Sequence, residues 1–162
     1  MKDLHGRRRS RAQALQLLFQ AEMTAQSISS LLTKQDYALE DGPLDEYAGK
    51  LALAAYEQKE HFDQMIDKVS DNWSIDRLPL VDRCLLHMAL AEISSAEFAE
   101  TSVAIDEAVE LSKRYGTDNS YRYINGILGQ LVRSQSVHSS EDAELVQTEA
   151  DQDDNKAGIL DE

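Results

Sequence analysis

The chain has 162 residues, of which 42% are hydrophobic and 28% are charged, and its formal net charge at pH 7 is -14. This composition is ordinary for a globular protein with one buried core, and the single cysteine excludes an internal disulfide framework. No apolar run approaches the roughly 20 residues that span a bilayer, and residues 1–10 lack the apolar stretch of a secretory signal. We therefore expect a cytoplasmic protein.

The first half of the sequence has three segments with helical periodicity. Residues 11–23 place Leu15, Leu18 and Phe19 on one helix face. A weaker segment covers about residues 31–39. Pro43 then opens a long helical pattern over about residues 44–69, because proline fits the first turn of a helix. The expected inner face of that helix consists of Tyr47, Leu51, Ala54, Ala55, Phe62, Met65, Ile66 and Val69.

The second half adds three more helices after a break at the sequence DNWSIDRLP. Pro79 restarts the pattern, Gly116 is placed to end the next helix, and Thr117 or Asp118 can cap the last one. The apolar stripes are Val81, Cys84, Leu85 and Met88; Ile105, Ala108, Val109 and Ser112; and Ile124, Ile127, Leu128 and Leu131. Because no alternating strand pattern occurs, the sequence predicts an all-α helical bundle of about seven helices in two packed halves that meet near Trp73.

The end of the sequence has a different character. Residues 135–162 contain nine acidic residues and one lysine, with little apolar content and no periodicity. Such a segment cannot bury enough apolar surface to offset its ordering entropy. We therefore predict a helical domain over residues 1–134 and a disordered acidic tail over residues 135–162.

The sequence contains no strong sign of catalysis. It lacks a glycine-rich phosphate loop, a histidine pair at metal-ligand spacing and a nucleophile elbow. Cys84 and His87 could share a helix face, but a cysteine in an apolar stripe is usually a buried core residue. The paired acidic positions Asp63, Asp67, Glu107 and Glu110 are typical of solvated helix faces. We predict a non-enzymatic protein without a metal or cofactor.

The strongest functional signal is a cluster of arginines near the start of an acidic chain, Arg7, Arg8, Arg9 and Arg11. Guanidinium groups hold phosphates through paired hydrogen bonds and keep their charge at cellular pH. Positive charge at a helix N-terminus opposes the helix dipole, so a reason other than helix stability should favour it. The pattern indicates nucleic-acid binding, with a flexible solubilising end as the alternative.

The sequence YRYING, at the start of the last helix, adds a second candidate contact. Tyr121, Arg122 and Tyr123 have the stacking and charged groups that readers of single-stranded RNA use. The alternative is that the tyrosines cover the core. Gly126 and Gly129 each cost helix stability, which indicates close approach of another helix or of a ligand.

Three segments carry a family resemblance: RRRSRAQALQLLFQAE, NWSIDRLPLVDRCLLHMALAEI and SVAIDEAVELSKRYGTDNSYRYINGIL. In this order and spacing, over about residues 6–134, they resemble the NusB family of bacterial transcription antitermination factors. The resemblance implies an all-helical, non-enzymatic protein that pairs with the small-subunit ribosomal protein NusE. The pair would bind boxA-type RNA in ribosomal RNA leaders and help to assemble an antitermination complex on RNA polymerase.

The resemblance also implies roles for individual residues. The arginine cluster would hold RNA phosphates, Arg122 and Tyr123 would contact RNA, and Phe19 and Asp82 would lie on the partner-binding surface. Three positions depart from the family pattern: His87 stands where arginine is usual, Ala91 where tyrosine is usual, and Glu100 where proline is frequent. These departures concern the partner surface and the entry to one helix.

Two other functions stay open at this point. NusB-like domains also occur fused to ribosomal RNA methyltransferases, so the chain could be a substrate-binding helical subunit that works with a separate catalytic chain. It could also be a helical scaffold that does not bind RNA. The sequence leaves the oligomeric state open, including a homodimer.

Overall fold

A computed structural model of the chain describes residues 4–40, 42–70, 74–95 and 97–135. Of the predicted tail over residues 135–162, residue 135 is described, and it is helical; residues 136–162 and Trp73 lie outside the described residues. The chain divides into two units, Met1–Gly129 and Gln130–Glu162. Of the second unit, residues 130–135 are described, and they are helical.

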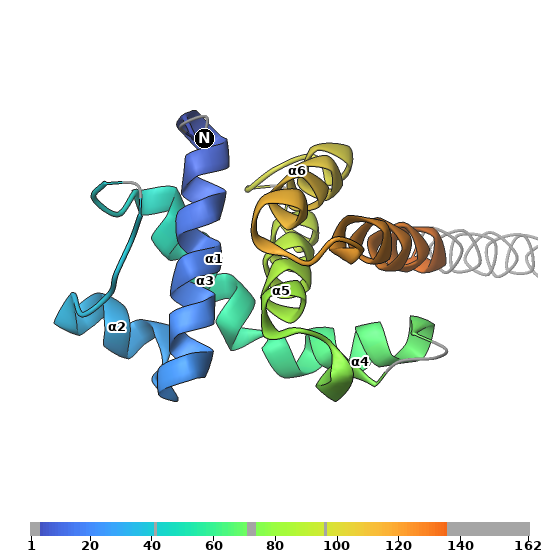
Figure 1. The fold of residues 1–162 in the computed structure, drawn as a ribbon, viewed down its shortest axis with the longest axis horizontal. Helices are drawn as coiled ribbons and strands as arrows, with labels where there is room; N and C mark the ends of the chain where they lie inside the picture. Colours follow the sequence, from blue (N-terminus) through green and yellow to red (C-terminus); the bar gives the residue numbers. More distant parts are fainter. Residues whose placement is uncertain (1–3, 41, 71–73, 96, 136–162) are drawn as a thin grey trace, which may run out of the picture. The chain divides into compact units, whose positions relative to one another are not determined.

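The described residues form helices and no strands, which confirms the predicted all-α class (Figure 1). None of these helices has the length and apolar content needed to span a bilayer. The elements in chain order are α1 (Gly6–Thr24), α2 (Ile28–Lys34), α3 (Glu46–Glu57), α4 (Lys59–Val69), the short 3-10 helix η1 (Ile75–Arg77), α5 (Leu80–Ser94), α6 (Thr101–Tyr115) and a last helix over residues 120–135.

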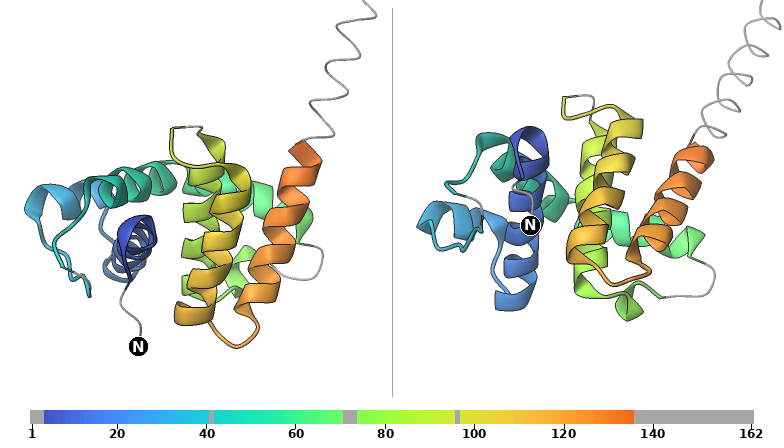
Figure 2. Two further views of the ribbon diagram at one scale, coloured as in Figure 1. Left: turned by 90° about the horizontal axis from the view of Figure 1, so that it is seen from above. Right: turned by 45° about the horizontal axis from the view of Figure 1, so that its top comes forward.

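Helix α5 is at the centre of the first unit. It packs against α1, α3, α4 and α6, and Figure 2 shows it side by side with α6. Because neighbours surround it, every residue from Cys84 to Glu92 is buried. The expected single apolar stripe is therefore only part of a helix that is covered nearly all round.

Helix α1 begins at Gly6, earlier than the periodicity predicted. Gly6 has a φ of 56°, in the left-handed region that glycine adopts readily. The arginine cluster therefore lies within the first turns of a helix that packs on α3 and α5. The cluster consequently belongs to a packed helix and not to an irregular end of the chain.

The single long helix expected over residues 44–69 is two helices. α3 and α4 meet at Gln58, whose φ of -105° and ψ of 8° interrupt the helix. The change of direction lets α4 bury Phe62 against α5. Pro43 precedes α3 without entering its first turn, because Asp45 is the N-cap. Neither proline nor glycine marks the break, so helical periodicity alone cannot locate it.

Gly116 ends α6 for a reason other than left-handed backbone. Its φ of -86° and ψ of -170° are extended. A Cβ at this position would lie 2.6 Å from the Cβ and Oγ of Ser120 and 2.7 Å from the carbonyl oxygen of Ser112. Ser120 begins the last helix, and its hydroxyl accepts a hydrogen bond of 2.8 Å from the Thr117 N–H. The glycine is therefore required by close packing between two helix ends.

Alanine at Gly116 is expected to lower the free energy of unfolding by about 1–3 kcal/mol, because its neighbours must shift to admit a methyl group. Gly126 is the matched control, since nothing lies within 4 Å of a Cβ added there. Gly126→Ala is expected to stabilise the helix by up to about 1 kcal/mol. Urea denaturation measures both changes, and equal stabilities of the two variants would contradict this account. The close contact predicted at Gly126 is not found among the described residues.

Candidate nucleic-acid interface

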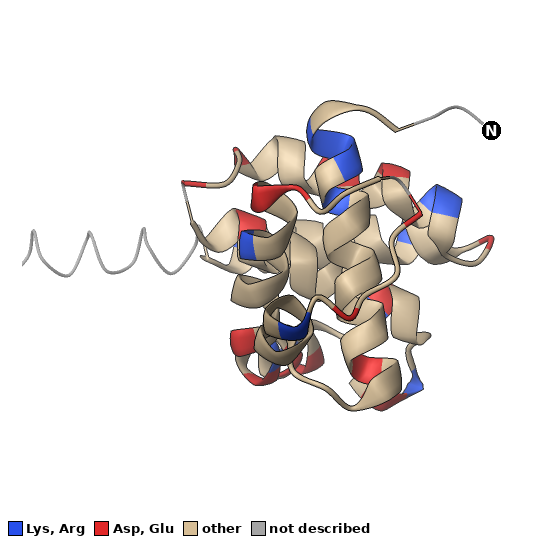
Figure 3. Ribbon diagram, turned by 90° about the vertical axis from the view of Figure 1, so that its left-hand side faces the viewer, with Lys and Arg blue, Asp and Glu red and all other residues tan. Residues whose placement is uncertain are grey.

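The arginine cluster lies at the N-terminal end of α1, where Figure 3 shows basic residues in the helix that follows the N-terminus. The Arg8 side chain is 46% exposed, and its Nε and Nη2 atoms each donate to a Glu107 carboxylate oxygen at 2.8 Å. The hydrogen bond from Arg8 is the main cause of a Glu107 pKa below its usual value. Glu107 was predicted on a solvated face, but it links α6 to the cluster because an arginine 99 positions away lies beside it.

Arg11 points into the protein. Its side chain is 5% exposed, and its Nε donates to a Glu92 carboxylate oxygen at 2.6 Å. Tyr47 donates to the other oxygen of Glu92 at 3.2 Å, and burial, with the nearby Glu92 charge, raises the pKa of Tyr47 to about 12. Arg11 thus differs from the expected phosphate contact: because it is buried, its guanidinium joins α1 to α5 and has almost no exposed surface.

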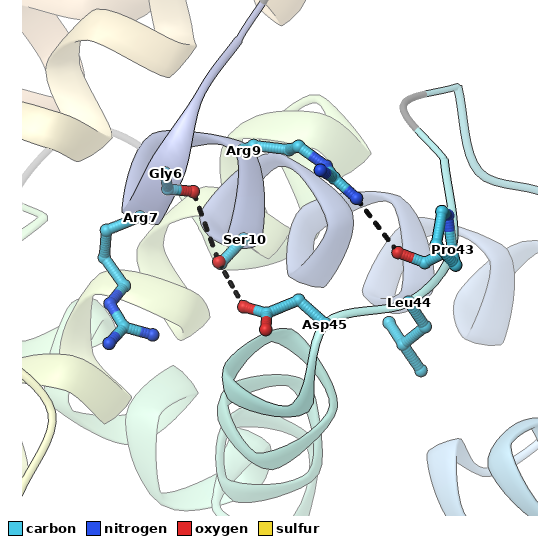
Figure 4. Close-up of a pocket in the computed structure, with 7 residues that line it drawn as sticks. All are labelled: Gly6, Arg7, Arg9, Ser10, Pro43, Leu44 and Asp45. Atoms are coloured by element: carbon cyan, nitrogen blue, oxygen red, sulfur yellow. Dashed lines mark hydrogen bonds between the residues drawn. The ribbon is translucent and has the colours of Figure 1, made fainter.

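Arg7 and Arg9 border the start of α1 on different sides. Arg7 is exposed, and its guanidinium carbon lies 3.7 Å from the centroid of the Tyr47 ring, a cation–π contact. Arg9 donates from Nη2 to the Pro43 carbonyl at 3.2 Å, and its buried Nε has no hydrogen-bond partner among the described residues. Both arginines line an open pocket of about 540 Å³, where Figure 4 shows Ser10 donating to the Asp45 carboxylate.

A row of glutamines on α1, which we call the glutamine stripe (Gln13, Gln16 and Gln20), was not identified from the sequence. Each glutamine accepts from a backbone N–H of the segment 36–45 through its side-chain oxygen, at 3.0 to 3.1 Å. Gln13 and Gln20 also donate to backbone carbonyls of that segment. The spacing of three and then four residues is visible in the sequence, but it also fits a solvated helix face.

Phe19 lies in an apolar groove of about 670 Å³, which we call the Phe19 groove. Phe19 is 36% exposed and Met23 is 64% exposed, which is unusual for large apolar side chains. The apolar lining includes Leu15, Phe19, Met23, Leu39, Val81 and Tyr115. The groove is therefore lined by side chains of α1, of residues 38–40, of the start of α5 and of the end of α6.

Asp82 is not presented on this groove. It is 4% exposed, and burial raises its pKa although a hydrogen bond with Ser120 opposes the change. One of its oxygens, Oδ1, is buried without a hydrogen-bond partner among the described residues. Its neighbour Val81 lines the groove instead. The predicted charged contact at position 82 is therefore not available on the surface in this conformation, because Asp82 is the buried residue of the first turn of α5.

Arg122 and Tyr123 project from the first turns of the last helix in different surroundings. The Tyr123 hydroxyl lies 3.2 Å from the Ser70 hydroxyl, and the residue is half-buried. Arg122 is exposed, and its guanidinium carbon lies 5.4 Å from the centroid of the Tyr121 ring. Lys113 approaches the same ring at 5.9 Å. Two cations therefore approach the Tyr121 ring, and Tyr121 is the aromatic residue that accompanies Arg122.

Cys84 and His87 do not form a nucleophile pair. Cys84 is 1% exposed, and burial raises the pKa of its thiol to about 12, so no reactive thiolate forms near neutral pH. The His87 ring nitrogen Nε2 hydrogen-bonds to Asp63, and Arg83 donates to the same carboxylate at 3.0 Å. Asp63 was predicted on a solvated face, but it holds α4 to α5. The described residues contain no cluster of three side chains that could hold a metal ion.

Because of the Asp63 carboxylate, the free energy of unfolding is expected to fall as the pH becomes acidic. Burial alone would raise its pKa, but hydrogen bonds from His87 and Arg83 outweigh burial and place the pKa below its usual value. Such a carboxylate stabilises the fold above its unfolded pKa of about 3.9, and the contribution is lost as pH falls through the folded pKa. Urea denaturation from about pH 7 to about pH 3 is expected to show a weaker acid dependence for D63N than for the unmodified protein. Parallel pH profiles would contradict this assignment.

Comparison with known proteins places these features in a family. The model of the NusB family matches residues 8–133. The transcription antitermination protein NusB of Chloroflexus aggregans is 36% identical over 132 residues, covering 78% of this chain and 86% of that protein. Among solved structures, T. maritima NusB matches with a TM-score of 0.66 and 33% identity, covering 82% of this chain and 93% of that one.

A further structure, of the antitermination factors NusB and NusE in complex with dsRNA, matches with a TM-score of 0.63 and 25% identity. The match covers 79% of this chain and 96% of the matched chain. The relatives are named as antitermination proteins and not as enzymes, which agrees with the prediction of a non-enzymatic protein. Family model, sequence relatives and fold all lead to one conclusion: the chain belongs to the NusB family of transcription antitermination proteins.

Proposed function

We propose that this chain acts in the cytoplasm as an antitermination factor that binds boxA-type single-stranded RNA together with the ribosomal protein NusE. The complex on the RNA of ribosomal leaders would then join the antitermination complex on RNA polymerase. Membership of the NusB family supports the process, and the related complex of NusB and NusE with dsRNA supports NusE and RNA as the classes of partner.

The observation that carries the RNA-binding proposal is the set of guanidinium groups at the start of α1. Arg7 and Arg8 are exposed, and Arg9 reaches the neighbouring pocket. These three arginines are the proposed phosphate contacts, because guanidinium hydrogen bonds suit phosphate oxygens. Arg11 supports them from the interior through its ion pair with Glu92.

The proposed RNA surface continues to the start of the last helix. Arg122 supplies a second positive charge, and Tyr123 supplies a half-buried aromatic residue beside it. Tyr121 joins them in the proposal because Arg122 and Lys113 both approach its ring. Aromatic rings with adjacent cations are suited to stacking with unpaired bases.

The Phe19 groove is the proposed contact with NusE. Exposed Phe19 and Met23 are available to an apolar side chain of a partner, and desolvated aromatic residues supply much of the energy of protein interfaces. Asp82 lies beneath this surface and would act by supporting α5 next to Val81.

Fluorescence anisotropy with a labelled boxA RNA, with and without NusE, tests the two contacts separately. The proposal expects tighter RNA binding when NusE is present. Phe19→Asp is expected to remove the effect of NusE while leaving the weaker RNA binding of the chain alone unchanged. If the chain fails to bind RNA in both conditions, the role is that of a protein scaffold. If Phe19→Asp keeps the full effect of NusE, the partner site lies elsewhere.

A further inference from the structure

The pair between Arg8 and Glu107 lies at the surface, within the proposed RNA contact. The exposed fractions of the two side chains are 46% and 18%, and both hydrogen bonds are 2.8 Å long. Two of the five N–H donors of a guanidinium are used in this pair. Three donors remain for a phosphate, but the positive charge of Arg8 is already balanced by the carboxylate.

Glu107 is not required to neutralise the buried arginine of the cluster. Its carboxylate lies 3.9 Å from Arg11 Nη1, whereas Glu92 accepts from Arg11 Nε at 2.6 Å. Removing the charge of Glu107 therefore leaves the buried pair of Arg11 and Glu92 in place. The main partner of Glu107 is the exposed Arg8, whose hydrogen bond lowers the pKa of the Glu107 carboxyl.

We propose that Glu107 competes with RNA phosphates for Arg8 and thereby limits the strength with which the arginine cluster binds RNA. This inference rests on the proposed function, in which Arg8 contacts a phosphate. A phosphate that approaches Arg8 must either displace the carboxylate or bind beside it with reduced Coulomb attraction. Glu107 therefore sets RNA affinity without touching the RNA.

The salt dependence of binding reports this competition. An arginine with an unbalanced charge displaces cations from single-stranded RNA and contributes about 0.7 to the slope of log affinity against log salt. An arginine balanced by a carboxylate displaces few cations. Loss of the Glu107 charge is therefore expected to steepen the slope as well as tighten binding at low salt.

The test compares E107Q with D106N in anisotropy titrations of boxA RNA over a salt series. Asp106 is exposed on the same helix, so D106N removes an equal charge next to the tested position. E107Q is expected to bind RNA about threefold more tightly at low salt, because a surface ion pair contributes only modestly and the released Arg8 gains a correspondingly modest attraction for phosphate. Its salt slope is expected to steepen by about 0.7. D106N is expected to keep the original slope, and thermal melting verifies that both variants fold.

An R8Q variant separates failure of this inference from failure of the proposed function. If R8Q weakens RNA binding but E107Q fails to strengthen it, Glu107 does not compete, although Arg8 still contacts RNA. If E107Q weakens binding, Glu107 positions Arg8 for the phosphate and the inference is overturned. If R8Q leaves RNA affinity unchanged, the Arg8 contact itself is wrong and the competition is overturned with it.

Discussion

Alanine in place of Glu92 is expected to lower the free energy of unfolding by about 3–5 kcal/mol. Glu92 is 1% exposed, and the Arg11 side chain that it neutralises is 5% exposed. The substitution would leave a buried guanidinium without its counter-charge and would remove the acceptor of the Tyr47 hydroxyl. Urea denaturation at neutral pH measures the loss.

Two further variants test whether burial is the cause of that loss. Glu110→Ala removes an exposed pair with Lys113 and is expected to change stability by less than about 0.5 kcal/mol. Replacing Arg11 by methionine and Glu92 by leucine together is expected to recover most of the stability, because no buried charge remains. An E92A variant that unfolds like the E110A variant would show that the Arg11 pair is solvated.

Alanine in place of Phe62 is expected to cost a similar amount, about 3–5 kcal/mol, because a large buried ring leaves a cavity. Phe62 is 1% exposed, and its ring lies 6.4 Å from that of His87, between α4 and α5. Phe19→Ala is the matched control, since Phe19 is 36% exposed. The control is expected to keep most of its stability and to lose affinity for NusE. Equal losses of stability in the two variants would contradict the assignment of Phe19 to a surface groove.

Local features of the fold could be predicted from the sequence. The all-α class, the start of α5 after Pro79 and the end of α6 at Gly116 follow from periodicity and from residues that begin or end helices. The break at Gln58 could not be predicted, because packing of α4 on α5 imposes it. Helix α5 is covered nearly all round, so apolar residues occur on most of its faces. The sequence pattern therefore does not show which face of α5 packs against which neighbour.

The candidate site could be predicted less completely than the fold. The arginine cluster can be recognised from the sequence, but its carboxylate partners cannot. The partner of Arg11 is 81 positions away and the partner of Arg8 is 99 positions away. Such distant contacts depend on how the helices pack, so an internal arginine and an exposed one have the same appearance in the sequence. The glutamine stripe was missed for the same reason, since polar residues at helical spacing fit a solvated face equally well.

The most direct test of the central claim is the salt dependence of boxA RNA binding by a variant in which Arg7, Arg8 and Arg9 are glutamine. With about 0.7 for each of Arg7 and Arg9, and little from Arg8 because Glu107 balances its charge, the slope of log affinity against log salt is expected to become shallower by about 1.4. A variant with glutamine at the exposed positions Lys34, Lys68 and Arg77 removes the same charge elsewhere and is expected to keep the slope of the unmodified chain. Unchanged affinity and slope in the arginine variant would contradict RNA binding through the start of α1.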